Sequence, residues 1–257
     1  MIVHQQALPP SLTPFSVLGL PIHLTNDYLG WLVAQAQQRH GCHVVTLNAE
    51  MTMQAEQSDR LAAVIRQADL IIPDGAGIVL YLKLYGKHIQ RLPGIELAES
   101  LLQAFSQQKL GTVFFYGGQP GVAESAAAQL TQRFPGLQFA GIQHGFLPPE
   151  DLPTFEQQLQ TLQPNLILVG MGVPRQEFWI AEHRHLCPNA IWIGVGGSFD
   201  IWAGSKIRAP EFFRKNHLEW LYRLYQEPWR WRRMLALPQF AWQGLLFRTG
   251  LRKPIPG

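Results

Sequence analysis

The stretch ADLIIPDGAGIVL, residues 68–80, decides the fold of this chain. Its apolar run Leu70–Ile72 is typical of a buried strand, which should end at Pro73 because proline has no N–H for a sheet ladder. The two glycines that follow allow a tight turn into an apolar helix from about Ile78. Asp74 is then left at the carboxyl end of a strand, where open α/β sheets bind their ligands. The alternative on this stretch alone is that Asp74 only caps the helix.

Strand and helix patterns alternate on both sides of this stretch, with the lengths of repeated βα units. After a short hairpin at Ser16–Leu24, the expected strands are His43–Leu47, Leu70–Ile72, Thr112–Tyr116, Gln138–Gln143, Leu166–Gly170 and Ala190–Val195. The expected helices include one from Thr25 or Asn26 to about Arg39, Glu50–Gln67, Ile95–Gln108, one that ends at Arg133, one from Glu150 and one that ends at about Leu186. Such units predict an α/β fold with a Rossmann-like body, in which helices cover both faces of a parallel sheet.

The alternation ends after Asp200. Residues 209–247 contain no convincing strand and predict helices interrupted at Pro210, Pro228 and Pro238. We expect these helices to form an appendage that packs on the α/β body or is hinged beside it. The chain is therefore divided into an N-terminal extension over 1–15, an α/β core over 16–200 and a helical, basic and aromatic appendage over 201–257.

Charged and aromatic residues are unevenly distributed along the 257 residues. From Phe199 to the end, eleven Lys and Arg face four Asp and Glu, a net charge of +7, whereas the preceding residues have a net charge of −4. Twelve aromatic residues lie in the same basic part. This combination suits a membrane interface. One alternative is a helix packed on the core with a solvated basic side. Another is a nucleic-acid surface, which the acidic body and the lack of a binding motif disfavour.

Glycine-rich turns follow three of the expected strands, at Gly117–Gly118, Gly170–Gly172 and Gly194–Gly197. They favour a nucleotide or phosphate ligand, because such turns present backbone N–H groups, although tight turning alone would also explain them. None fits the G-x-G-x-x-G pattern followed by an acidic residue for a ribose. The turns therefore disfavour NAD.

The sequence predicts neither a metal site nor a cofactor. It has no D-x-D, no paired carboxylates and no H-x-x-x-H, and His183 and His185 are spaced to point apart on a helix, as surface residues do. Cys42 and Cys187 are too few for a disulfide framework or a zinc site, and we expect reduced, buried thiols in a cytosolic protein. No apolar run has the length needed to cross a bilayer. Arginines would therefore have to supply positive charge to a bound diphosphate.

Six ordered blocks of sequence resemble those of one family. They are TLNAEM (46–51), PDGAGIV (73–79), RLPGIEL (91–97), GMGVPRQEFW (170–179), GVGGSFDIWAGSKIRAP (194–210) and EWLYRLYQEPWRWRRM (219–234). From about Phe15 to Met234, the chain is similar to the WecG/TagA/CpsF glycosyltransferases, glycosyltransferase family 26.

The resemblance implies an inverting, metal-independent transferase. It would move N-acetylmannosamine, or a related sugar, from a UDP donor to a polyprenyl-diphosphate-linked N-acetylglucosamine in cell-surface polysaccharide synthesis. The enzyme would be cytoplasmic and peripheral at the inner face of the plasma membrane, docked through its C-terminal appendage, with no nucleic-acid partner. Apolar strips on a protein with few charges are also compatible with a homo-oligomer.

The resemblance assigns the role of catalytic base to Asp74, and a carboxylate among apolar residues should have a raised pKa, as this role favours. The arginines of the appendage would close over the pocket and stabilise the leaving UDP. Gln90 departs from the Glu found in many members, so an ion pair there would be lost. The implied substrate-binding residues are Thr46, Asn48, Arg91, Gln176, Asp200, Arg223, Arg230 and Arg233.

Two other classes of function compete with the transferase. One is a catalytically silent module of the same fold that binds a nucleotide sugar or a lipid, and the presence of Asp74, Gln176 and the tail arginines argues against it. The other is a Rossmann-type oxidoreductase, which the missing ribose acid disfavours.

Overall fold

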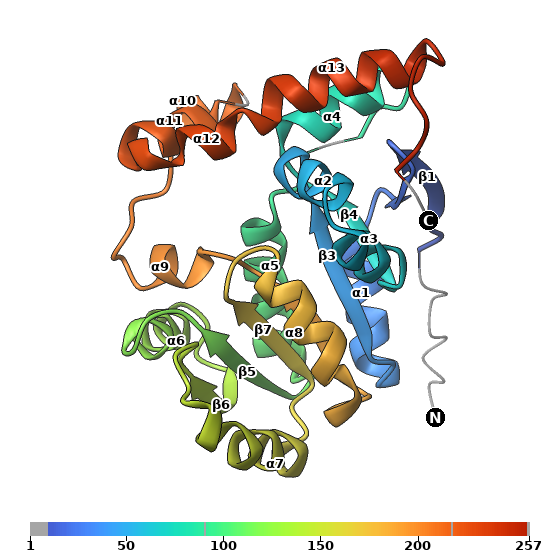
Figure 1. Ribbon diagram of the computed structural model, residues 1–257. Coiled ribbons are helices and arrows are strands. Elements are labelled where there is room, and N and C mark those ends of the chain that lie inside the picture. The colour runs from blue at the N-terminus through green and yellow to red at the C-terminus, as the bar shows by residue number, and fades with distance from the viewer. Residues whose placement is uncertain (1–9, 90, 217, 256–257) are drawn as a thin grey trace.

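The structure, a computed structural model, describes residues 10–89, 91–216 and 218–255 (Figure 1). Its centre is a six-stranded sheet in the order β4-β3-β8-β7-β5-β6, and every neighbouring pair is parallel. The strands are β3 (Cys42–Leu47), β4 (Leu70–Pro73), β5 (Thr112–Gly117), β6 (Gln138–Gln143), β7 (Leu166–Gly170) and β8 (Ile191–Gly194). The predicted α/β fold with a parallel sheet is confirmed.

Helices cover both faces of this sheet, as the βα repeats predict. One face lies against α1 (Tyr28–Gln38), α5 (Gly94–Gln108), α6 (Val122–Arg133) and the short α9 (Ser198–Trp202). The other face lies against α2 (Ala49–Glu56), α3 (Asp59–Arg66), α7 (Leu152–Leu162), preceded by η1 (Pro149–Asp151), and α8 (Arg175–His183), followed by η2 (Arg184–Leu186). An antiparallel hairpin of β1 (Thr13–Val17) and β2 (Leu20–Leu24) precedes these layers, so regular structure begins inside the expected N-terminal extension.

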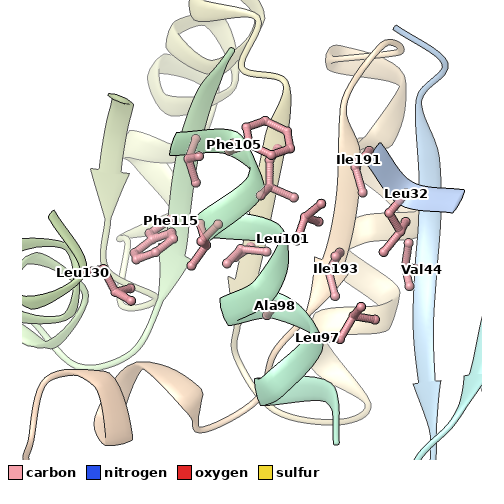
Figure 2. Packing of buried hydrophobic residues seen from close by; sticks show 14 of the residues in the cluster. Leu32, Val44, Leu97, Ala98, Leu101, Phe105, Phe115, Leu130, Ile191 and Ile193 are labelled. Carbon is pink, nitrogen blue, oxygen red and sulfur yellow. The ribbon is translucent and has the colours of Figure 1, made fainter. Parts of the chain in front are cut away.

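The largest core cluster shows why α5 folds as it does. Apolar residues recur along one stripe of this helix and point at the sheet (Figure 2). They pack in one cluster with Phe115 of β5 and with Ile191 and Ile193 of β8. Burying each such aliphatic side chain contributes about 1.5–3 kcal/mol. The helix is thereby fixed across the middle strands, and its first residue, Gly94, is fixed at their C-terminal edge.

Several expected helix boundaries are wrong. The single helix expected over Glu50–Gln67 is two helices, because Ser58 caps α3, its hydroxyl accepting a hydrogen bond from the Leu61 N–H at 3.3 Å. Pro238 does not interrupt a helix, since it lies in the first turn of α13 (Ala236–Arg248), where backbone N–H groups have no helical partner to lose. The helix after β4, α4 (Gly75–Leu84), also starts earlier than Ile78.

The histidine prediction is wrong for His183, although His185 is exposed as expected. His183 is buried, and its ring stacks on Trp179 with 4.4 Å between ring centroids. Its Nε2 lies 3.0 Å from Glu156 of α7. Cys42 and Cys187 are free and buried, as predicted.

The C-terminal appendage consists of two parts that are attached differently. The first comprises α10 (Glu211–Lys215), α11 (Glu219–Gln226), η3 (Pro228–Arg230) and α12 (Trp231–Met234), and none of their residues is buried. The second is α13, which lies beside α4 (Figure 1) and buries Phe240 against Tyr81 at 5.8 Å between ring centroids.

The residues after α13 return to the N-terminal hairpin. The Ile255 N–H donates to the Leu18 carbonyl at 2.8 Å, and the Ile255 carbonyl accepts from Arg66 at 2.9 Å. Arg252 forms an ion pair with Glu56. The second part of the appendage is therefore fixed to the core at both ends. No helix within the described ranges combines the length and the apolar character needed to span a membrane.

Candidate active site

A cavity of about 590 Å³ opens at the C-terminal edge of the sheet, between the ends of β3, β4, β7 and β8 and the first part of the appendage. This edge is where the sequence places the ligand site. The cavity brings together every residue assigned a site role from the sequence. They are Asp74, Thr46, Asn48, Arg91, Gln176, Asp200, Arg223, Arg230 and Arg233.

Asp74 follows directly on β4, where its N–H donates to the Leu47 carbonyl of β3 at 2.8 Å. It occupies the position before α4 without a side-chain capping hydrogen bond, and the amide of Gly75 at the start of this helix acts on the carboxylate only as a minor influence on its pKa. The structure therefore gives no support to the alternative that Asp74 serves only as a cap.

The surroundings of Asp74 raise its pKa from the ordinary 3.8 to about 6. Burial is the largest cause, because it disfavours the charged form. The charge of Glu219 acts in the same direction, while Arg91 and the backbone amides of Gly94 and Gly75 oppose it. The expectation of a raised pKa is confirmed. At neutral pH the carboxylate is mostly ionised and can accept a proton.

Arg91 joins the body to the appendage. Its guanidinium lies 2.6 Å from Glu219 of α11 and also donates to the Arg214 carbonyl at 3.3 Å. Glu219 is thus the carboxylate partner of Arg91, whereas Gln90, whose departure from the family pattern was noted above, lies outside the described residues.

Thr46 is the last residue but one of β3, and Asn48 directly follows this strand. The Asn48 side chain caps α2, accepting from the Met51 N–H at 2.9 Å. The Thr46 side chain packs on Gly94, where an added Cβ would lie only 3.0 Å from the Thr46 methyl carbon. Glycine at position 94 therefore lets the start of α5 approach the cavity wall closely.

The cations of the appendage are paired with carboxylates that also line the cavity. The Glu227 carboxylate lies 3.0 Å from the amine of Lys206, 3.1 Å from the guanidinium of Arg230 and 3.7 Å from that of Arg223. Burial acts to raise the pKa of Glu227, but the hydrogen bond and charge of Lys206, together with the two arginines, hold it below its ordinary value. Asp200 lies 4.0 Å from the same Lys206 amine.

Arg233 pairs with the body rather than with Glu227. Its Nε lies 2.7 Å from Glu50 of α2. Besides Arg91, five cations therefore line the cavity but are held by carboxylates, namely Lys206, Arg208, Arg223, Arg230 and Arg233. An incoming anion would have to compete for them.

Sequence analysis assigned no site role to six charged residues that line this cavity, namely Glu50, Arg175, Lys206, Arg208, Glu219 and Glu227. All six lie inside the quoted blocks of sequence. The available signal was the pair of acidic residues inside an otherwise basic block. Within the described part of the chain, no three His, Cys, Asp or Glu side chains gather in a way that could hold a metal ion.

Comparison with known proteins decides the family. The glycosyl transferase WecG/TagA/CpsF family matches residues 15–254, nearly the whole chain. The chain belongs to this family. This WecG/TagA/CpsF protein is a glycosyltransferase, and the oxidoreductase alternative is set aside.

Several relatives of this WecG/TagA/CpsF protein share one name, N-acetylglucosaminyldiphosphoundecaprenol N-acetyl-beta-D-mannosaminyltransferase. The Bacillus spizizenii relative is 40% identical over 233 residues, which cover 90% of this chain and 87% of the relative. A Staphylococcus aureus relative is 36% identical over 210 residues, which cover 80% of this chain and 81% of the relative. The Bacillus subtilis relative is 33% identical, with 79% of each covered.

Proposed function

We propose that this enzyme transfers N-acetylmannosamine, or a closely related sugar, from a UDP donor to a polyprenyl-diphosphate-linked N-acetylglucosamine. The product would be used in the synthesis of a cell-surface polysaccharide. The names of the relatives support the sugar and the acceptor, since they name both for those proteins.

In the proposed reaction, the acceptor hydroxyl oxygen attacks the anomeric carbon of the donor sugar, and Asp74 takes the hydroxyl proton. The bond between the anomeric carbon and the β-phosphate oxygen breaks on the opposite side, so the configuration inverts. UDP leaves with the electron pair of that bond. Arg223, Arg230 and Arg233 would stabilise its developing charge.

The observation that supports this assignment most strongly is that one cavity contains both a candidate base and a cluster of cationic side chains. A carboxylate with its pKa raised to about 6 lies at the body side, while three arginines and Lys206 lie at the appendage side. A base suited to neutral pH and a cationic site for a diphosphate are what this transfer requires.

The test is UDP release by the purified protein from UDP-N-acetylmannosamine and a short-chain N-acetylglucosaminyl-diphospho-lipid, with EDTA present. Asp74→Asn keeps the size of the side chain and removes the base, so we expect release to fall by about 10³-fold. UDP binding by the variant, measured by calorimetry, should remain close to wild type.

Wild-type protein that binds UDP but transfers no sugar to the acceptor, across a panel of UDP sugars, would support the silent binding module instead. Retention of activity by Asp74→Asn would show that the base is another group. Activity that requires a divalent cation would contradict the metal-independent mechanism.

We also propose that the enzyme docks on the cytoplasmic face of the membrane through its appendage. Exposed aromatic side chains on the first part of the appendage support this, because Trp229 is 72% exposed and Tyr225 is 82% exposed beside the basic residues of α12. Amphipathic rings among arginines suit the headgroup layer of an anionic bilayer.

A further inference from the structure

We infer that Gln176 is a positioning residue rather than a substrate ligand, and that the buried Glu177–His43 pair holds its amide in place. One atom of Gln176 would thereby fix the distance between the two glycine turns at the ends of β7 and β8. This inference rests on the proposed function in one respect, because it takes these turns to contact the donor diphosphate.

Both polar atoms of the Gln176 amide are bound by the protein. Its Oε1 accepts from the Gly172 N–H at 3.1 Å and from the Gly196 N–H at 3.0 Å. Its Nε2 donates to Glu177 at 2.9 Å, and only 2% of the residue is exposed. Although Gln176 borders the cavity, both polar atoms of its side chain therefore point into the protein.

The orientation of this amide is fixed from both sides. A reversed amide would place its N–H₂ group against two backbone N–H donors and its oxygen against a carboxylate, and both contacts would be repulsive. Gly194 leaves the room for this arrangement, since an added Cβ there would lie 2.3 Å from Nε2 of Gln176.

Glu177 is held in turn by His43 of β3. Its second carboxylate oxygen, Oε2, lies 3.2 Å from Nε2 of His43, and both side chains are about 1–2% exposed. A carboxylate only accepts hydrogen bonds, so His43 donates through Nε2. A chain of hydrogen bonds thus runs from the interior of β3, through α8, to two turns that line the cavity.

The consequence is that two sides of the cavity wall are held at a fixed separation. The turn after β7 and the turn after β8 approach the same oxygen atom, and residues of both turns line the cavity. Buried polar networks of this kind are rigid when every member is satisfied. Removal of any link should let the two turns move apart and should weaken donor binding without removing a donor contact.

The structure supplies a matched control on the same helix. His183, at the other end of α8, is also paired with a glutamate, Glu156 at 3.0 Å, but it does not line the cavity. His43→Leu and His183→Leu therefore break the same kind of pair, one linked to the cavity and one not. His43→Gln is the conservative variant, because a glutamine amide can donate to Glu177 from nearly the same position.

The first measurement is the dissociation constant of UDP by calorimetry, together with the melting temperature of each variant. We expect Gln176→Met and His43→Leu to weaken UDP binding by between about 5- and 100-fold, as misplaced binding groups do. His43→Gln should restore most of the affinity. His183→Leu should lower the melting temperature and leave the affinity unchanged.

The second measurement follows the amides of Gly172 and Gly196 by hydrogen exchange in ¹⁵N-glycine-labelled protein. Both should exchange faster in Gln176→Met and in His43→Leu than in wild type or in His183→Leu. Because this readout needs no ligand, wild-type protein that fails to bind UDP would count against the proposed function while the exchange still tests the present inference.

Weaker UDP binding in Gln176→Met with no change in His43→Leu would identify Gln176 as a direct ligand and overturn the inference. Equal effects of His43→Leu and His183→Leu on affinity would also overturn it, since they would reflect stability alone. Unchanged hydrogen exchange at Gly172 and Gly196 in Gln176→Met would show that Gln176 does not hold these two turns together.

Discussion

At the scale of single residues, the raised pKa of Asp74 links catalysis to stability. Its folded-state value of about 6 exceeds the ordinary 3.8, so the folded protein holds a proton that the unfolded chain releases between these values. Folding is therefore penalised above pH 6 by on the order of 3 kcal/mol, and the penalty disappears below pH 4.

This penalty predicts that Asp74→Asn is more stable than wild type at pH 7.5 although it is inactive. We expect its melting temperature to be higher by a few degrees at that pH, with the difference shrinking to nothing as the pH falls to 4. Thermal melts across the pH range measure this. A variant less stable than wild type at pH 7.5 would show that the carboxylate is stabilised by its neighbours, contrary to the burial argument.

The same carboxylate predicts the pH dependence of the reaction. Catalysis needs the ionised form, so kcat/KM for the acceptor should fall on the acid side with an apparent pKa near 6. Arg91 favours the charged form and Glu219 disfavours it. Arg91→Met should therefore move this limb to higher pH, and Glu219→Gln should move it to lower pH.

Rate profiles of these two variants distinguish an electrostatic effect from general damage to the site. If the acid limb moved in the same direction in Arg91→Met and in Glu219→Gln, the assignment of this limb to Asp74 would be contradicted. Loss of rate with an unchanged limb would show that Arg91 and Glu219 act only in binding.

At the scale of elements, the appendage combines two kinds of attachment. The second part, α13, is held by apolar contacts such as that of Phe240 with Tyr81. The first part has no buried residue and is held by ion pairs, which include Arg91–Glu219 and Arg233–Glu50. Surface ion pairs contribute at most about 1 kcal/mol each and are weakened by salt.

We therefore expect 1 M NaCl to release α10–α12 while α13 stays in place. Limited proteolysis with mass spectrometry should show new cuts between 211 and 234 at high salt, and the KM for the UDP donor should rise at the same time. Residues 236–248 serve as the internal control. Equal protection of both parts at low and high salt would contradict this division.

The sequence was informative where one local pattern determined the outcome. Local patterns predicted the strand at Leu70–Ile72, the glycine turns after the strands and the basic C-terminal appendage. The ordered blocks identified residues around the cavity. The break at Ser58 was missed because the apolar periodicity on both sides of it continues.

Contacts between distant residues were not predictable from such patterns. The burial of His183 depends on Trp179 and on Glu156 from another helix, and the spacing of two histidines says nothing about either. The inward orientation of Gln176 likewise depends on Gly196, and the carboxylate of Glu177 that holds the Gln176 amide is itself held by His43; only the fold brings these residues together.

At the scale of the whole molecule, the helices α4 and α13 lie side by side (Figure 1), and each carries exposed apolar side chains. Leu80 is 57% exposed on α4, and Trp242 is 59% exposed on α13. Leu84 and Leu245 are exposed on the same two helices. A surface of this kind on a protein with a basic appendage fits contact with a bilayer.

We expect the triple variant Leu80→Ser, Leu84→Ser, Trp242→Ser to bind vesicles that contain anionic lipid more weakly than wild type, with the remaining binding due to Trp229, Tyr225 and the basic residues of α12, while its affinity for UDP stays unchanged. Co-sedimentation measures the first quantity and calorimetry the second. Phe146→Ser is the control, because Phe146 is 57% exposed in the segment after β6, away from these helices. Equal vesicle binding by the triple variant and wild type would place the membrane contact elsewhere.

The position of α4 ties the reacting carboxylate to the proposed bilayer contact. This helix begins directly after Asp74, and its exposed Leu80 and Leu84 lie six and ten residues further on, about 9 and 15 Å along the helix axis. Leucines four residues apart share one face of a helix, so a bilayer that touches both would run along α4, and these distances are lateral. The helix would then act as an anchor that keeps the base beside the headgroup layer, where the diphosphate of a lipid-linked acceptor lies.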